Sequence, residues 1–224
     1  MDNLRVLLKK LVETPGPAGF EDRVRDILVE ELREHVDSTE VDPLGNVVFV
    51  KEGKEGSPRI MIDAHMDEVG LMVRYVDQKG FVYFDKHGWV DDRILLSQWV
   101  ALHTKKGPVK GVIGTRGFHV LTPAEKERVI SSKDMWIDIG AKTREDAARL
   151  GVRVGDPITF DRGYEELGGG EYVAAKALDD RLGCLAMIQT MKELDGSDLD
   201  VSVYAVGTVQ EEIIARGTKV AAFK

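Results

Sequence analysis

The sequence predicts an α/β protein that is interrupted by a β-rich domain. Helical patterns with a 3.6-residue period occur near both ends of the 224 residues, whereas short alternating strands fill the stretch from Leu71 to about Tyr164. With 43% hydrophobic residues, the chain has ample apolar material for a core. We therefore expect an α/β domain that is split in the sequence by a separately folded insertion.

The first part of the chain predicts two helices, a hairpin and a strand. Four leucines share one helical stripe before the helix-breaking T-P-G-P-A-G, namely Leu4, Leu7, Leu8 and Leu11. A second amphipathic helix, with its charged residues on a solvated face, is expected from Phe20 to Val36. Residues 38–51 predict two strands around a P-L-G-N turn, and a further apolar strand leads to His65.

The middle of the chain is typical of a small barrel or sandwich. Runs such as F-V-Y-F, W-V-A-L-H and D-P-I-T-F are separated by Gly, Lys and Asp, and one helix is expected between a cap at Thr143 and Gly151. The polar, Gly-rich stretch 161–171 is expected to be an exit linker. After it, a helical pattern resumes at Leu182.

Composition argues against several classes of function. The net charge is −8 and no run of Lys or Arg is long enough to follow a phosphate backbone, so no nucleic-acid partner is expected. The start lacks an apolar signal core and no stretch of about 18 apolar residues occurs, so we expect a cytoplasmic protein without a membrane partner. Cys184, the only cysteine, is expected to be a buried structural thiol. Three histidines without ligand spacing are expected to be structural or surface residues: His87, His103 and His119.

The stretch I-M-I-D-A-H-M-D-E-V-G, residues 60–70, contains the first candidate site. The side chains of His65 and Asp67 would leave the same face of an extended chain, which suits a metal-binding imidazole and the carboxylate that orients it. A single histidine at a strand end is more often only hydrogen-bonded. This motif alone therefore leaves both interpretations open.

Two acidic pairs strengthen the metal hypothesis. Asp179 and Asp180 precede the helical pattern at Leu182, where they would serve equally well as helix caps. Glu211 and Glu212 are expected to end an apolar strand, and the carboxyl ends of strands are where open α/β sheets carry their sites. Together with the histidine, these carboxylates predict a site for two divalent ions.

Ordered matches along the whole chain resemble one known family. They are T-P-G-P-A-G-F-E, D-P-L-G-N-V, D-A-H-M-D-E-V-G, W-I-D-I-G-A, A-L-D-D-R-L-G and V-Q-E-E, and they are similar to motifs of the glutamyl and deblocking aminopeptidases, the co-catalytic metallo-aminopeptidases of the tetrahedral type. The resemblance implies a catalytic domain with a mixed sheet and helices on both faces, formed by residues 1–68 and 166–224. Residues 69–165 would be an inserted β-rich dimerisation domain.

The resemblance also implies a role for each candidate residue. His65 would bind one metal ion and Glu212 the other, while Asp179 would bridge the two. Glu211 would be the general base, and Asp67 would be the acid that supports the histidine. The cofactors would be two divalent ions per subunit, zinc or cobalt, and the reaction would be hydrolysis of N-terminal residues from short peptides.

The family pattern extends beyond this sequence. Family members continue past V-Q-E-E with a further Asp and a final His ligand, and they assemble as dimers and dodecamers, so self-association through the inserted domain is expected. As the sequence is given, each ion would lack one protein ligand, and we expect weak activity at best. Two alternatives stay open: a non-catalytic assembly subunit or fragment, and a glucanase-type hydrolase on the same framework, which the paired glutamates disfavour.

Overall fold

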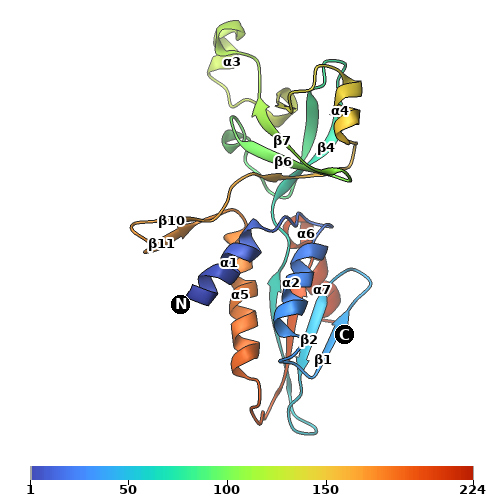
Figure 1. Cartoon of the computed structure of the whole chain (residues 1–224), viewed down its shortest axis with the longest axis vertical. Coiled ribbons are helices and arrows are strands. Elements are labelled where there is room, and N and C mark those ends of the chain that lie inside the picture. The colour runs from blue at the N-terminus through green and yellow to red at the C-terminus, as the bar shows by residue number, and fades with distance from the viewer. Residues whose placement is uncertain (1, 224) are drawn as a thin grey trace. The chain divides into compact units, whose positions relative to one another are not determined.

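The computed structural model describes residues 2–223 (Figure 1). The chain forms two compact units, of which one extends through Glu68 and resumes at Gly163, and the other is Val69–Arg162. The expected domains 1–68, 69–165 and 166–224, understood as parts that fold and dimerise separately, remain a prediction.

The discontinuous unit is an α/β structure with short helices near its C-terminal end. Its elements are α1 (Asp2–Glu13), α2 (Asp22–Leu32), β1 (Ser38–Val41), β2 (Val47–Lys51), β3 (Arg59–His65), β10 (Glu165–Leu167), β11 (Tyr172–Ala174), α5 (Leu178–Glu193), β12 (Ser202–Thr208), α6 (Glu211–Ile214) and α7 (Arg216–Ala221).

A mixed four-stranded sheet with the order β1-β2-β12-β3 lies at the centre of this unit. Strand β12 runs antiparallel to β2 and parallel to β3. The predicted β1–β2 hairpin is confirmed, and Asp42 holds its turn, because Oδ1 accepts the backbone N–H groups of Leu44, Gly45 and Asn46. The sheet thus joins an N-terminal hairpin to two parallel strands that are far apart in the sequence.

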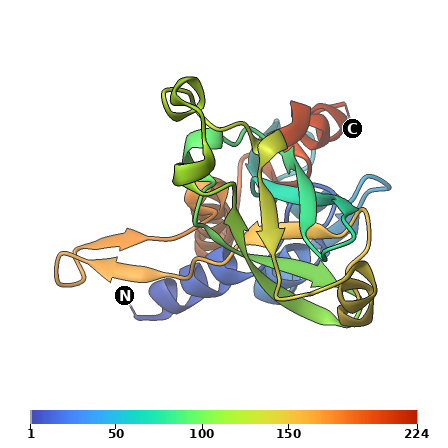
Figure 2. The same cartoon turned by 90° about the horizontal axis from the view of Figure 1, so that it is seen from above.

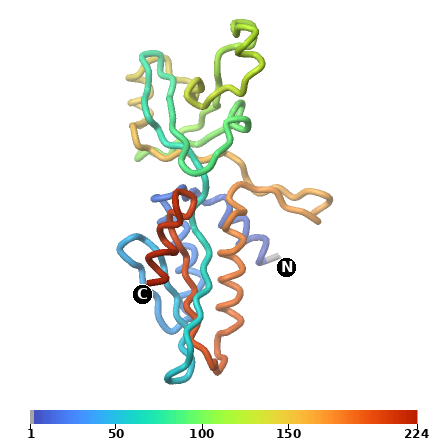
Figure 3. The backbone as a smooth tube through the Cα atoms, turned by 180° about the vertical axis from the view of Figure 1, so that it is seen from behind, coloured from blue at the N-terminus to red at the C-terminus, as the bar shows by residue number. Residues whose placement is uncertain are grey.

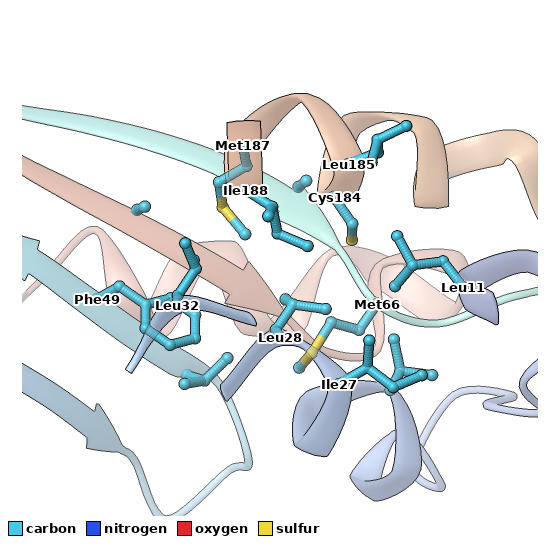
Figure 4. Packing of buried hydrophobic residues seen from close by; sticks show 14 of the residues in the cluster. Leu11, Ile27, Leu28, Leu32, Phe49, Met66, Cys184, Leu185, Met187 and Ile188 are labelled. Carbon is cyan, nitrogen blue, oxygen red and sulfur yellow. The ribbon is translucent and has the colours of Figure 1, made fainter. Parts of the chain in front are cut away.

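Helices α1, α2 and α5 form the hydrophobic core against one face of this sheet (Figure 4). Leu11, Leu28 and Ile188 represent the three helices, and all three side chains are fully buried. They pack in one cluster with Phe49 of β2. Burial of this apolar area is the main stabilising contribution to the unit.

The opposite face of the sheet is covered less completely. Figure 3 shows α7 on this side, away from α1 and α2. A hollow of about 550 Å³ remains here, lined by side chains that include Val48, Met61 and Tyr204, and by Ala221 and Ala222 at the end of α7. The expected mixed sheet with helices on both faces is therefore present, with unequal cover on its two faces.

The second predicted helix is shorter than the expected range from Phe20 to Val36. At its start, the N–H of Phe20 bonds to the carbonyl of Pro17 in a turn, so helix α2 begins only at Asp22. At its end, the N–H of His35 turns back to the carbonyl of Leu32. The chain must turn there to enter β1, and tertiary pairing therefore overrides the helical periodicity.

The expected exit linker at 161–171 contains a strand. Strand β10 pairs antiparallel with β11, with Glu165 opposite Ala174. Three successive glycines with positive φ, Gly168–Gly170, form the tip. Left-handed backbone costs glycine little, so these residues allow a tight turn and the flanking residues pair.

The strand that leads to the paired glutamates also ends earlier than predicted. Strand β12 stops at Thr208, and Gln210 follows in the left-handed region with a φ of 56°. Glu211 and Glu212 therefore open the short helix α6 instead of ending the strand.

The continuous unit is a closed barrel with the strand order β4-β5-β8-β7-β6-β9 (Figure 2). It confirms the expected barrel or sandwich. Its elements are β4 (Gly70–Val76), β5 (Val82–His87), β6 (Trp99–Thr104), β7 (Gly107–Gly114), α3 (Pro123–Lys126), β8 (Trp136–Asp138), α4 (Arg144–Leu150) and β9 (Pro157–Phe160), with 3₁₀ turns at Asp92–Ile94, Phe118–Val120 and Ser132–Asp134.

Helix α4 of this unit begins and ends as its sequence predicts. Thr143 is the N-cap, and its hydroxyl accepts the N–H of Asp146. Gly151 ends the helix in the left-handed conformation, with a φ of 95°. None of the helices within residues 2–223 combines the length and apolar character needed to cross a membrane.

Candidate functional site

The candidate site lies where the two parallel strands of the discontinuous unit end. His65 is the last residue of β3 and pairs in register with Thr208, the last residue of β12. The N–H of Met66 bonds to the carbonyl of Thr208 at 2.7 Å, which keeps the two chains together beyond the sheet. The segments that follow the strands carry Asp67 on one side and Glu211 on the other. This placement agrees with the general location of sites at the carboxyl ends of parallel strands.

The imidazole of His65 is nearly buried and is oriented by the residue that was expected to support it. Its Nδ1 lies 3.1 Å from the backbone oxygen of Asp67 and 3.5 Å from Oδ1 of the same residue. Its Nε2 lies 3.1 Å from Oδ1 of Asp179 and 3.8 Å from Oε2 of Glu211. One ring nitrogen is therefore held by the protein, and the other faces the carboxylates.

Asp67 has a second function that the sequence does not predict. Its side chain is fully buried, and its two oxygens accept the N–H groups of Glu211 and Glu212 at 3.0 and 2.9 Å. The same carboxylate thus orients the histidine and fixes the backbone of both glutamates. Bidentate acceptance of two successive N–H groups leaves the start of α6 little freedom.

The two aspartates at the start of α5 have different roles. The backbone at Asp179 and Asp180 is not helical, so the regular helix begins after them. Asp180 Oδ1 accepts the N–H of Gly183 at 3.0 Å, which is the capping function that was left open as the simpler interpretation. The side chain of Asp179 instead is 89% exposed and contacts His65.

The carboxylates determine the electrostatics of the site. Burial alone would lower the pKa of His65, but hydrogen bonding and charge from Asp67, followed by Asp179 and Glu211, raise it to about 9. Burial would raise the pKa of Asp67, but the bonds from His65 and from the two backbone N–H groups lower it. For Glu212, burial and the neighbouring carboxylates outweigh the histidine and raise the pKa. The site concentrates negative charge around one imidazole.

Three charged residues beneath the site escaped the analysis of the sequence as functional residues. Nζ of Lys176 donates to both oxygens of Glu68 at 2.8 and 2.9 Å, and both side chains are buried. Glu68 follows Asp67, and Lys176 precedes Asp179 by three positions. Arg181 is also fully buried, and its Nη1 donates to the carbonyls of Leu11 and Thr14. No pattern in the sequence pairs these residues.

The side chains at the site could supply some of the ligands of a metal centre. Imidazole nitrogen and carboxylate oxygen are ligands that zinc and cobalt accept, and a histidine whose other nitrogen is held by a carboxylate is the usual arrangement in such sites. Within residues 2–223, however, no group of three or more His, Cys, Asp and Glu side chains is arranged to hold an ion. The carboxylate of Glu212 makes no hydrogen bond or ion pair with His65 or Asp179 in this part of the chain. The site therefore brings together His65, Asp67, Asp179 and Glu211. The side chain of Glu212 is near enough for their charges to affect it, but makes no direct contact with His65 or Asp179.

The remaining candidate residues behave as structural groups. The buried thiol of Cys184 lies 3.4 Å from the carbonyl oxygen of His65, and burial raises its pKa to about 12, so it is a poor nucleophile, as expected. In the barrel, Nε2 of His103 hydrogen-bonds to the hydroxyl of Thr159 at 2.8 Å. These contacts support a structural role for both residues.

The fold, and a site in which carboxylates surround one histidine, agree with one hydrolase family. The sequence model for the M42 glutamyl aminopeptidases matches residues 45–224, and the chain belongs to this family. It is 39% identical to a putative aminopeptidase, SgcX, of Escherichia coli K12, over 94% of this chain and 56% of that protein.

Solved structures agree with this assignment. A TET aminopeptidase from the marine sediment archaeon Thaumarchaeota archaeon SCGC AB-539-E09 matches 99% of this chain and 63% of its own, with a TM-score of 0.95 and 36% identity. The Pyrococcus horikoshii TET1 peptidase, described as able to assemble into a tetrahedron or a large octahedral shell, matches 98% of this chain and 64% of its own, with a TM-score of 0.88 and 36% identity. The chain thus spans about three fifths of the length of these relatives.

Proposed function

We propose that this chain is the metal-binding part of an aminopeptidase that removes N-terminal residues from short peptides. The observation that carries the proposal is the orientation of His65, whose Nδ1 is held by Asp67 while its Nε2 faces Asp179 and Glu211. Membership of the M42 family, which is metal-dependent, supports the same reaction. We further propose two divalent ions per subunit, zinc or cobalt, as the cofactors.

Each residue has a distinct proposed role. His65 and Asp179 would hold one ion, Asp179 would also reach the second, and Glu212 would complete the second set after its side chain reorients. When bound, the pair of ions would lower the pKa of water and polarise the scissile carbonyl. Glu211, whose carboxylate is 43% exposed beside the imidazole, would take up the proton from the attacking water. Asp67 would keep the imidazole and the backbone of both glutamates in place.

The proposal extends to the assembly and the location of the protein. We propose that the protein self-associates through residues 69–165, as a dimer and then as a dodecamer. The Pyrococcus horikoshii relative, which can assemble into a tetrahedron or a large octahedral shell, supports this. We also propose a cytoplasmic location.

A comparison of two proteins tests the proposed function. Residues 1–224 and a version extended by the remaining portion of a full-length relative are dialysed against zinc or cobalt, and metal stoichiometry and turnover of aminoacyl anilides are measured. Since the described residues offer at most two ligands per ion, and catalytic zinc normally has three, the short chain should bind metal weakly and turn over slowly. Two tightly held ions and full turnover in the short chain would contradict the incomplete centre.

A second candidate function is a non-catalytic assembly subunit. The absence of a group of three metal-binding side chains within residues 2–223 favours it. In the same experiment, an assembled protein that neither binds metal nor gains turnover when extended would support the assembly subunit. Release of sugar from a soluble glucan, measured in parallel, would instead support the glucanase-type alternative.

A further inference from the structure

A buried carboxylate from the N-terminal segment reaches the same backbone that Asp67 holds. Glu21 stands just before α2 and is only 5% exposed. Its Oε1 accepts the N–H of Gly19 at 2.7 Å and the N–H of Gln210 at 3.0 Å. The side chain of Glu21 makes no cap hydrogen bond to its own helix. Its carboxylate is therefore directed away from α2 and toward the turn after β12.

The turn that Glu21 reaches needs external support. Gln210 has a φ of 56°, a left-handed conformation that is unfavourable for a non-glycine residue and persists only when its surroundings fix it. The next two N–H groups, of Glu211 and Glu212, are accepted by Asp67. Two buried carboxylates from different segments, those of Glu21 and Asp67, thus accept three successive backbone N–H groups. The first of these N–H groups belongs to Gln210, the residue in the left-handed conformation.

We infer that Glu21 is a positioning residue for Glu211 and Glu212, acting through its hydrogen bond to the N–H of Gln210. The inference rests on the proposed function for the role of the two glutamates, but not for the geometry. Without an acceptor at Glu21, Gln210 can leave its left-handed conformation and turn the chain that leads into α6. The carboxylate of Glu211 would then leave its position beside His65, and Glu212 would shift with it. Because the bond requires an acceptor and not a charge, glutamine should replace Glu21 and alanine should not.

Three variants of residues 1–224 test this inference. Glu21→Gln keeps an oxygen acceptor at the same reach, Glu21→Ala removes it, and Glu21→Asp keeps the charge but shortens the side chain, which also serves if the alanine variant does not fold. Asp77→Ala is the matched control, because Asp77 also accepts two backbone N–H groups, from Lys79 and Phe81, but lies in the barrel unit.

The first measurement is amide hydrogen exchange at residues 210–212. Glu21→Ala and Glu21→Asp should speed exchange there at least about tenfold, the scale expected when one hydrogen bond of roughly 1.4 kcal/mol is lost, while Glu21→Gln stays near the original rate. The second is Co²⁺ affinity from the visible absorption of the bound ion. The alanine and aspartate variants should bind about 10–100-fold more weakly, which is the usual effect of removing a residue that orients a ligand. Asp77→Ala should change neither measurement.

Each outcome has a defined meaning. Unchanged exchange and Co²⁺ affinity in Glu21→Ala would overturn the inference. Equal damage by Gln and Ala would overturn it as well, because the charge of Glu21 and not its acceptor would then matter. If the unaltered chain binds no Co²⁺, the proposed function loses its metal centre, but faster exchange confined to residues 210–212 in Glu21→Ala, with Glu21→Gln unaffected, would still support positioning by Glu21.

Discussion

Asp67 is the residue on which most of the candidate site depends. It touches the ring that would bind metal, and it accepts the backbone N–H groups of both glutamates. A single fully buried carboxylate therefore couples the ends of β3 and β12. Replacement of such a residue alters several groups together, so its mutation alone cannot assign a role to any one of them.

Mutation of Glu211 can test a single proposed role, that of the general base. In a catalytically competent, full-length form, Glu211→Gln should lower kcat by at least about a hundredfold, the usual scale for loss of a general base, while bound metal stays near the original stoichiometry. The side chain is half-exposed and its backbone N–H bond to Asp67 is unaffected by the change, so folding should be preserved. Loss of metal in this variant would exchange the assigned roles of Glu211 and Glu212.

The pKa of His65 gives a second test, in the metal-free protein. After treatment with EDTA, NMR titration should give a pKa of about 9, and Asp67→Asn should lower it, because Asp67 contributes the largest of the effects that raise it. Asp63→Asn, on the same strand, is the control and should leave it unchanged. The unfolded pKa is about 6.5, so the stabilisation by the protonated ring is complete below that pH and is lost as the pH rises through 9. A pKa near 6.5 in the folded protein would contradict the acidic environment described here.

The sequence shows which residues belong to the candidate site better than it shows which of them are in contact. His65 and Asp67 could be paired because they are two positions apart, and they do interact. Asp179 and Glu211 could be brought to the same histidine only by resemblance to a family, because nothing local links positions more than a hundred residues apart. Glu21 was assigned to a solvated helix face with the other charged residues, although its spacing of three and seven positions from Val24 and Leu28 places it on the apolar face of the predicted helix.

Among the elements, the start of α5 is joined to the end of β3 by the ion pair of Lys176 and Glu68. Both side chains are at least nine-tenths buried, at 9% and 2% exposure. Burial lowers the pKa of Lys176, and the charge and hydrogen bonds of Glu68 oppose this effect. Each charge thus offsets part of the cost of burying the other. This pair joins the two segments that present His65 and Asp179.

Breaking this pair should destabilise the unit strongly. Lys176→Met removes the nearest cation from the buried carboxylate of Glu68, which keeps only the N–H of Gly16 and the more distant Nη2 of Arg181, at 4.0 Å. We expect a loss of about 3 kcal/mol, the lower end of the range for a broken buried pair, in the free energy of unfolding measured with urea. Lys54→Met is the control, because Lys54 pairs with Asp200 in an exposed position and should change stability little. Equal, small effects of the two substitutions would show that the buried pair does not hold these elements together.

The lengths of the elements show where sequence patterns fail. Both ends of α4 were predictable. Thr143 caps the start with its side chain, and Gly151 ends the helix because its backbone adopts the left-handed conformation. Helix α2 and strand β12 lack such marks at their ends, so their periodicity suggested longer elements than the tertiary structure allows. Their true ends are set by turns at His35 and Gln210. These turns have partners elsewhere in the chain, because the ring of His35 bonds to Asp195 and the N–H of Gln210 bonds to Glu21.

For the whole molecule, the barrel unit should fold without the rest of the chain. Residues 69–165 contain a closed barrel with its own hydrophobic core, which includes Phe84, Leu102 and Ile137, and a closed barrel leaves no unpaired edge strands. Expressed alone, this segment should give a strand-dominated circular dichroism spectrum and sediment as a dimer. A monomer at high concentration would contradict its role in self-association, and a disordered product would contradict its proposed limits.

The parallel pairing of β3 with β12 also determines when the site can form during synthesis. Asp67 and Glu211 are 144 residues apart, and the second of them leaves the ribosome only after the entire barrel has been made. Domains generally fold as they emerge, so the barrel can reach its native structure while β3 still lacks its neighbour. The contacts that assemble the candidate site are among those of highest contact order in the chain, and they form last and slowest. A ribosome-bound chain stalled before residue 200 should therefore contain a folded barrel beside an unpaired β3, which makes this strand the segment most exposed to chaperones and to misassembly.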